Sequence, residues 1–263
     1  MRRILYAAVN QCLRGMVTGC DNILDNEYKK TLETDLPQQA WRFRSVLDIM
    51  VSDRVLFKIL LKYHQMNQLT DDQVLAATAA SLSALTQSGT QEASEEKGIS
   101  KIFPPEEILK TIHHYKTGLL FQCPWAVPLT IENYEKESVS YLLHALYQIG
   151  IGCQIMDDMV DISNDLKKYR HNYVISLIYH DSEDKEKNRL QDLMASNAKP
   201  HKKIVLLSDF PQAHLHAVQA ARKFLESGLK ALYSQPHRFL VEPSISYISN
   251  RIGANRFMSG IDK

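Results

Sequence analysis

Two short acid-rich segments carry the side chains best suited to chemistry. They are Asp21-Asn22-Ile23-Leu24-Asp25 and Asp157-Asp158-Met159-Val160-Asp161. Residues four apart share one face of a helix, so each segment can aim two carboxylates in the same direction. Such oxygen ligands suit Mg2+, which usually completes its coordination sphere with substrate phosphates. Two acidic faces that look at each other across a cavity would hold several divalent cations.

The surroundings of the second segment strengthen this interpretation. An acidic helical face is in most proteins only solvated, so one segment alone is weak evidence for a metal. The second segment, however, follows the mostly apolar run 142–156, which should be buried on nearly all sides. Three carboxylates at the end of a buried helix repel one another and lose hydration unless a cation compensates them. A metal ion is the simplest remedy.

Basic side chains near both segments could supply the other half of the chemistry. A site in which they converge with metal ions would bind a polyanion such as a diphosphate. Taken singly, each of these lysines is more often a solvated surface residue. They are Lys29 and Lys30 after the first segment, Lys116 beside Thr117 in the middle of the chain, and Lys167, Lys168 and Arg170 after the second segment.

Composition indicates one soluble domain. The 263 residues are 44% hydrophobic and have a formal charge of +1, which gives no basic field for a nucleic-acid partner. Four scattered cysteines without metal-ligand spacing indicate reduced thiols and a cytoplasmic protein. No stretch approaches the roughly 20 apolar residues that span a bilayer.

Helical periodicity runs through almost the whole chain, so the sequence predicts an all-α fold. The first helix is expected from about Arg3 to Lys30, and loops are expected at Ser88 to Lys101 and at Asn197 to Asp209. The other expected helices are Gln39 to Gln65, Asp71 to Gln87, Pro105 to Gln122, Glu132 to Leu166, Asn172 to Tyr179, Asp184 to Ala195, Gln212 to Leu232 and Arg238 to Arg256.

These motifs resemble those of a known family, the trans-type isoprenyl diphosphate synthases, within the class I terpenoid synthases. The first acidic segment is similar to the family's DDxxD motif, with Asn22 in place of the second aspartate. His114-Tyr115-Lys116-Thr117-Gly118 resembles its Lys-Thr diphosphate contact, and Gln154 followed by the second acidic segment resembles its second aspartate-rich motif. Ser52-Asp53-Arg54-Val55-Leu56 resembles a weaker segment between them. Order and spacing agree from residue 1 to about 180.

The resemblance implies an isoprenoid-synthase-type helical bundle around a deep apolar cavity, with the two acidic helices facing each other at its mouth. It also implies that about three Mg2+ ions bind the diphosphate of an allylic prenyl substrate and draw off charge as the carbon–oxygen bond breaks. The resulting carbocation is captured by isopentenyl diphosphate in chain-elongating members, and by a double bond of the same molecule in cyclising members.

The site residues implied by the resemblance follow from matching positions. Metal ligands are expected at Asp21, Asp25, Asp157 and Asp161, with Asp158 as a supporting carboxylate among them. Diphosphate contacts are expected at Lys116, Thr117 and Gln154, and at Lys167 or Lys168. Lys29 and Lys30 stand where elongating members carry an Arg pair that helps to bind isopentenyl diphosphate, and lysine keeps the charge but loses the bidentate fork.

Two departures from the family leave three functions open. Elongating members have roughly 70 or more residues before the first motif and this chain has 20, so the single domain 1–263 is short at its N-terminus. The Asn22 substitution softens the first metal site, although an amide oxygen can still ligate. A prenyltransferase is favoured, because the cyclase triad fails at Asn164, Lys168 and Asn172. A terpene cyclase or a non-catalytic subunit of a heteromeric synthase are the alternatives, and a homodimer or heterodimer is expected.

Overall fold

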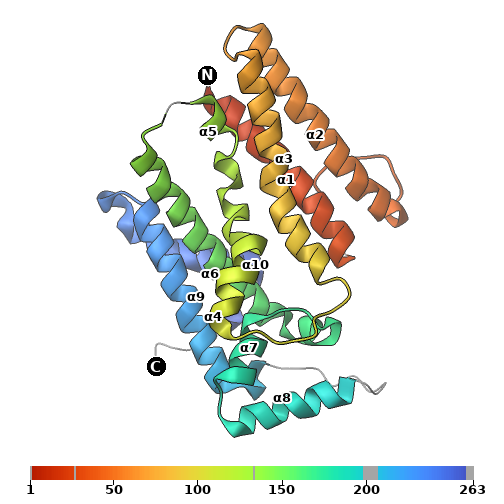
Figure 1. The fold of residues 1–263 in the computed structure, drawn as a ribbon, viewed down its shortest axis with the longest axis vertical. Coiled ribbons are helices and arrows are strands. Elements are labelled where there is room, and N and C mark those ends of the chain that lie inside the picture. Colours follow the sequence, from red (N-terminus) through yellow and green to blue (C-terminus); the bar gives the residue numbers. More distant parts are fainter. Residues whose placement is uncertain (1, 27, 133, 198–206, 259–263) are drawn as a thin grey trace. The chain divides into compact units, whose positions relative to one another are not determined.

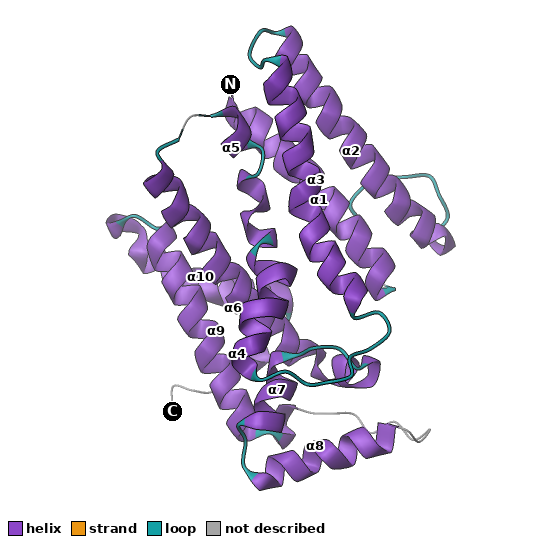
Figure 2. Cartoon of the chain, in the orientation of Figure 1, coloured by secondary structure: helices purple, strands orange, loops and turns teal. Residues whose placement is uncertain are grey.

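The computed structural model describes residues 2–26, 28–132, 134–197 and 207–258. Within these ranges the chain forms eleven α-helices with short 3-10 segments and one π-helix, and no strand (Figure 2). The predicted all-α class is therefore confirmed. None of the described helices has the length and apolar content that a bilayer crossing requires.

Internal contacts divide the chain into two compact units. The first unit comprises Met1–Ala93 with Gln122–Lys136, and the second comprises Ser94–Phe121 with Glu137–Lys263. Each has its own hydrophobic core. The first acidic segment belongs to the first unit, and the second acidic segment belongs to the second. The expected opposition of the two segments and the expected single domain both stay predictions.

The first unit is built on α1 (Arg2–Asp25), α2 (Trp41–Gln65) and α3 (Asp71–Ser94), with the short α5 (Pro128–Ile131) closing one end of its core (Figure 1). Helices α1 and α2 approach closely because glycines line their contact. A Cβ atom on Gly19 would lie 2.8 Å from the carbonyl oxygen of Ser45. Apolar side chains such as Leu5 and Leu60 are fully buried beside this contact.

Helix α1 ends five residues earlier than the sequence suggested. The helix stops at Asp25, and Asn26 takes a left-handed conformation with φ of 57°. Asparagine is one of the few non-glycine residues that adopt this conformation readily. Lys29 and Lys30 therefore lie in a loop, and the prediction that the first helix reaches Lys30 was wrong.

Helix α3 is longer than expected. The polar composition from Ser88 onward predicted a loop, but the helix continues to Ser94. A Cβ atom on Gly89 would meet nothing within 4 Å, so the helix has open space at this position. The other predicted loop, Asn197 to Asp209, falls mostly on residues 198–206, which lie outside the described residues.

The second unit is organised around α6 (Lys136–Lys168), the longest helix of the described chain. Helix α9 (Pro211–Leu232) packs along α6, and α7 (Tyr173–His180), α10 (Val241–Ile252) and α11 (Asn255–Met258) contact α9 in turn (Figure 1). A Cβ atom on Gly228 would lie 2.5 Å from the Ala145 carbonyl oxygen, so α6 and α9 meet backbone to backbone. Helix α8 (Asp184–Asn197) contacts α7.

The predicted burial of the run 142–156 is confirmed for its second half alone: residues 149–156 are all buried, whereas residues 142–148 are mostly half-buried and His144 is exposed. Ile151, Ile155 and Met156 are at most 1% exposed. The last two or so turns of α6 ahead of the acidic segment are thus core, and this core fixes the position of the aspartates that follow.

A π-helix, Ile108–Gly118, follows the single turn α4 (Pro105–Glu107) and lies against α6. Glycines again permit the approach. A Cβ atom on Gly150 would lie 2.7 Å from the Thr117 carbonyl oxygen, and one on Gly118 would lie 2.4 Å from the Tyr147 ring. The π-helix thereby brings Lys116 and Thr117 to the side of α6 that precedes the acidic segment.

Candidate active site

The second acidic segment presents its three aspartates in two different environments. Asp157 and Asp161, one helical turn apart on α6, are both half-buried. Asp158 is only 2% exposed. Two carboxylates can therefore reach a ligand from one face of α6, while the third points into the protein.

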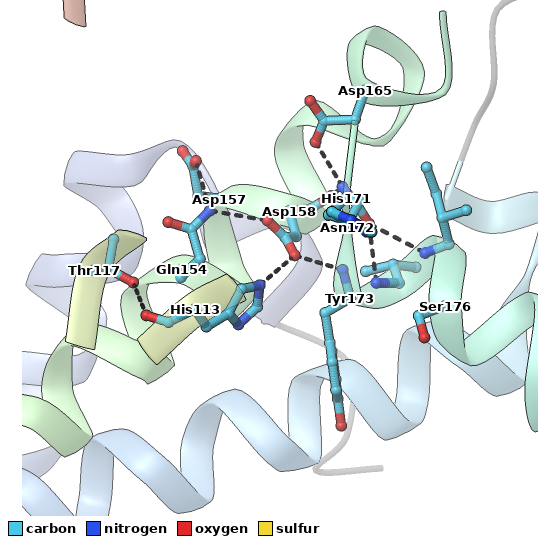
Figure 3. A network of polar contacts seen from close by, with 12 residues as sticks. His113, Thr117, Gln154, Asp157, Asp158, Asp165, His171, Asn172, Tyr173 and Ser176 are labelled. Carbon is cyan, nitrogen blue, oxygen red and sulfur yellow. Dashed lines mark hydrogen bonds and ion pairs between the residues drawn. The ribbon is translucent and has the colours of Figure 1, made fainter. Parts of the chain in front are cut away.

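Asp158 is the centre of a buried polar network (Figure 3). The Gln154 side-chain amide donates to Oδ1 at 2.9 Å. On the other oxygen, Oδ2, His113 Nε2 lies at 2.9 Å and the backbone N–H of Tyr173 donates at 2.6 Å. Both carboxylate oxygens thus have protein partners, drawn from the π-helix, from α6 and from the start of α7.

These partners keep Asp158 ionised. Burial alone would raise the pKa of this carboxyl, but the charge and hydrogen bond of His113, the charge of Lys116 and the Tyr173 N–H outweigh burial, so its pKa lies below the usual value. Lys116 lies three residues after His113 on the same π-helix, and its contact with a diphosphate stays a prediction.

Gln154, another predicted diphosphate contact, links two of the aspartates. Its Nε2 donates to Asp158 at 2.9 Å and lies 3.3 Å from Oδ2 of Asp157. Gln154 is 3% exposed, so the amide serves the carboxylates and is turned away from solvent. This geometry orients Asp157, and the direct contact of Gln154 with a diphosphate stays a prediction.

Asn172 extends the network to the N-terminus of α7. Its Oδ1 accepts from the backbone N–H groups of Val174 and Ile175 and so caps the helix. Its Nδ2 donates at 2.8 Å both to the Asp158 carbonyl oxygen and to Oδ2 of Asp165. One amide therefore joins two turns of α6 to the first turn of α7.

Asp165 is a second buried carboxyl in this network, 9% exposed. Burial raises its pKa to about 8, with further upward contributions from the charges of Asp158 and Asp161. Asp165 is therefore protonated at neutral pH in the metal-free protein. The row of acidic residues along α6 carries less negative charge than its sequence suggests.

Residues of the segment that precedes α4 contact the turn between α6 and α7 and hold it in place. His171 donates its backbone N–H to the buried Glu95 at 2.9 Å. Its ring stacks on Phe103 with centroids 4.7 Å apart. These contacts hold in place the residues that deliver the Tyr173 N–H to Asp158.

The first acidic segment lies at the C-terminal end of α1. Asp21 and Asp25 are half-buried, whereas Asn22 between them is 1% exposed. The Asn22 amide donates to the Lys29 carbonyl oxygen at 3.1 Å and accepts the Lys29 N–H at 2.8 Å. The substituted residue of the motif therefore pins the loop that carries the two predicted substrate lysines.

The remaining predicted lysines lie at exposed positions. Lys30 pairs with Glu33 at 2.6 Å. Lys167 and Lys168 are exposed in the last turn of α6, where positive charge suits the helix dipole. Their contacts with substrate stay predictions.

The donor set fits Mg2+ that is shared with a substrate. Among the described residues no three His, Cys, Asp or Glu side chains form a group that could hold a metal ion. Mg2+ is usually bound by one or two carboxylates together with substrate phosphates, and not by an all-protein cage. The half-buried pairs Asp21 with Asp25 and Asp157 with Asp161 meet that requirement.

Three residues of the network carried no functional prediction. They are His113, Asp165 and Asn172, of which only Asn172 entered the sequence argument, as a position at which the cyclase triad fails. The Asn172 cap could have been found, because an asparagine directly before an apolar helical run is a recognised N-cap signal. The pairing of His113 with a residue 45 positions away leaves no local signal.

Comparison with known proteins identifies the family of the chain. The family model for polyprenyl synthetase matches residues 41–206, a range that includes the Lys-Thr pair and the second acidic segment. None of the curated proteins matches the chain.

Solved structures of similar fold are prenyl diphosphate synthases. Geranylgeranyl pyrophosphate synthetase from Pyrococcus horikoshii aligns with a TM-score of 0.65 at 16% identity, over 94% of this chain and 79% of that one. Decaprenyl diphosphate synthase from Rhodobacter capsulatus aligns with a TM-score of 0.56 at 14% identity, over 96% and 80%.

A third structure was solved with ligands. Geranylgeranyl pyrophosphate synthase from Corynebacterium glutamicum, complexed with isoprenyl diphosphate and magnesium, aligns with a TM-score of 0.56 at 14% identity, over 93% of this chain and 78% of that one. These similarities confirm the isoprenoid-synthase-type fold, and the family match extends over more than half of the sequence. The chain therefore belongs to the polyprenyl synthetase family and is a prenyltransferase enzyme.

Proposed function

We propose that this enzyme is a Mg2+-dependent isoprenyl diphosphate synthase, which ionises an allylic prenyl diphosphate and joins the product to isopentenyl diphosphate. The observation that carries the proposal is the half-buried pair Asp157 and Asp161, one turn apart on α6, with Asp157 held by Gln154 and with Lys116 on the π-helix that packs against α6. The family match and the magnesium-bound structural relative support the same choice.

The residues of the second unit have two proposed roles, which are binding of the diphosphate and binding of the divalent cations. Lys116 supplies a positive charge for a diphosphate, and the Thr117 hydroxyl beside it can donate to a phosphate oxygen. Asp157 and Asp161 offer the hard oxygen ligands that a divalent cation requires. Mg2+ bound there, about three ions with the substrate in place, would stabilise the negative charge of the departing diphosphate.

The residues of the first unit are proposed to supply the second carboxylate pair, Asp21 and Asp25. Lys29 and Lys30 are proposed to bind the diphosphate of the second substrate. Asn22 has both amide atoms engaged by the Lys29 backbone, so we assign it to the shape of this loop and not to a metal. A homodimer or heterodimer in the cytoplasm stays a prediction.

Substrate dependence tests the reaction. Diphosphate release is measured with the purified chain, Mg2+ and allylic diphosphates of several lengths, with and without isopentenyl diphosphate. Release that requires both substrates and Mg2+ supports the proposal. Release from the allylic substrate alone would indicate a cyclase, and no release under any condition would indicate a non-catalytic subunit. EDTA provides the metal-free control.

A further inference from the structure

The contact between His113 and Asp158 joins the helix of the Lys-Thr pair to the helix of the metal-binding aspartates. We propose that Asp158 does not ligate a metal, and that His113 and Asp158 are instead a positioning pair that fixes Asp157 relative to Lys116. This inference deepens the proposed function and rests on it.

The occupancy of the Asp158 carboxylate is the first argument. Oδ1 accepts from Gln154, and Oδ2 accepts from the Tyr173 N–H and is paired with His113, all within 2.9 Å. The Asp158 side chain is 3% exposed and that of His113 is 1% exposed. A cation at Asp158 would have to displace these donors from a closed interior, whereas Asp157 and Asp161 are partly open to solvent.

The route from His113 to both halves of the site is the second argument. His113 is on the π-helix three residues before Lys116, and the Thr117 hydroxyl donates to the His113 carbonyl oxygen at 3.4 Å. On the other side, Gln154 contacts Asp158 at 2.9 Å and Asp157 at 3.3 Å. A displacement at the His113–Asp158 contact would therefore shift the side chains on both sides, Lys116 and Thr117 on the π-helix and Asp157 on α6.

The His113 ring depends on this single contact for its polar anchoring. Its other nitrogen, Nδ1, is buried and has no hydrogen-bond partner among the residues that the structure describes. Loss of the Asp158 carboxylate therefore weakens or removes the hydrogen bond that holds the ring in place. Partners that orient a metal ligand in this way typically contribute about 10- to 100-fold to metal affinity or activity.

Calorimetric titration of the full chain with inorganic diphosphate at several Mg2+ concentrations tests the pair. The variants are His113→Gln, Asp158→Asn and the double variant, and thermal unfolding of each sets a measuring temperature at which it is folded. We expect each single variant to bind Mg2+–diphosphate at least about tenfold more weakly than the wild type. The double variant should be no weaker than the weaker single variant, because both substitutions break one contact.

His114→Gln is the matched control. His114 is the next residue of the same π-helix, but its ring contacts Tyr147 at 3.2 Å and not the acidic segment. Its substitution should leave Mg2+–diphosphate affinity within about twofold of the wild type. Asp158→Asn keeps the shape of the side chain, so it provides the test should His113→Gln fail to fold.

Three outcomes would overturn the inference. If Asp158→Asn abolishes binding while His113→Gln binds normally, Asp158 is a metal ligand. If both singles lose thermal stability but keep full affinity, the pair is only structural. If the wild type itself shows no Mg2+-dependent diphosphate binding, the proposed function fails first and the inference falls with it, which separates that failure from the other two.

Discussion

The two acidic segments share a spacing but are supported in different ways. In each, the first and fifth residues are half-buried carboxylates and the second residue is buried: Asn22 in one, Asp158 in the other. Asn22 binds backbone only seven residues away, while the partners of Asp158 reach to His113, 45 residues away. The first segment thus depends on a local loop, and the second depends on packing between three helices.

The largest effect is expected from removal of a carboxylate that we propose binds Mg2+. Asp157→Ala and Asp161→Ala should each lower kcat by at least about 100-fold, because each removes charge stabilisation that develops with the leaving diphosphate. Steady-state diphosphate release measures the loss. Asn164→Ala, an exposed position on the same helix, is the control. Equal rates for Asp157→Ala and the control would show that the second segment has no role in chemistry.

The buried network around Asp158 should contribute strongly to the free energy of unfolding. Asp158→Ala leaves His113 and the Tyr173 N–H buried without their acceptor, and loss of one partner of such a buried pair typically costs about 3–5 kcal/mol. Urea unfolding followed by circular dichroism gives the free energy of unfolding. A loss below about 1 kcal/mol would mean that the network does not hold α6, α7 and the π-helix together.

Asp165 has no counterpart in the first segment and should give the second unit a distinctive pH dependence. Its pKa is raised to about 8, so the native state holds a proton that the unfolded chain releases above its ordinary value near 4. Stability should therefore fall as pH rises from about 4 to about 8. In metal-free buffer Asp165→Asn should remove this slope and be more stable than the wild type at pH 8, with little difference near pH 4. Parallel curves of stability against pH would refute the raised pKa.

The close approach of the π-helix to α6 can be tested by steric means. Gly150→Ala places a methyl group 2.7 Å from the Thr117 carbonyl oxygen, so the backbone must shift, at about 1–3 kcal/mol. Gly89→Ala is a matched control in open space and should stabilise α3 by about 0.5–1 kcal/mol. Chemical denaturation of both variants gives the comparison. Stabilisation by both substitutions would contradict the packing described for Thr117.

The smallest effect is expected when the first segment is made to resemble the second. Asn22→Asp restores the family's second aspartate, but it replaces the Nδ2 donor with an oxygen that faces the Lys29 carbonyl. An unsatisfied contact of this kind costs about 1–3 kcal/mol. We expect lower stability and no gain in the Mg2+ concentration dependence of activity. A variant with tighter Mg2+ binding would show instead that Asn22 is a weakened ligand.

The sequence predicted most helices, the family and the spacing of the aspartates, because periodicity and motif order are local properties. It did not predict that α1 ends at Asp25, where Asn26 takes a left-handed conformation, or that α3 continues through its polar stretch. Nor could it separate Asp158 from Asp157, since both are aspartates and only contacts with a histidine 45 residues away distinguish them. Tertiary packing decides which aspartate of the motif points into the protein and which faces solvent.

The π-helix determines the direction in which the Lys116 side chain leaves the helix axis. Its backbone bonds span five residues, as in the 2.9 Å bond from the Leu119 N–H to the His114 carbonyl oxygen, and long runs of this winding are rare. A peptide of residues 105–121 in isolation should rewind with the ordinary four-residue spacing, visible in its NMR contacts. The angular position of Lys116 therefore depends on packing against the neighbouring helices, and a short excised fragment would not reproduce the proposed anion-binding surface.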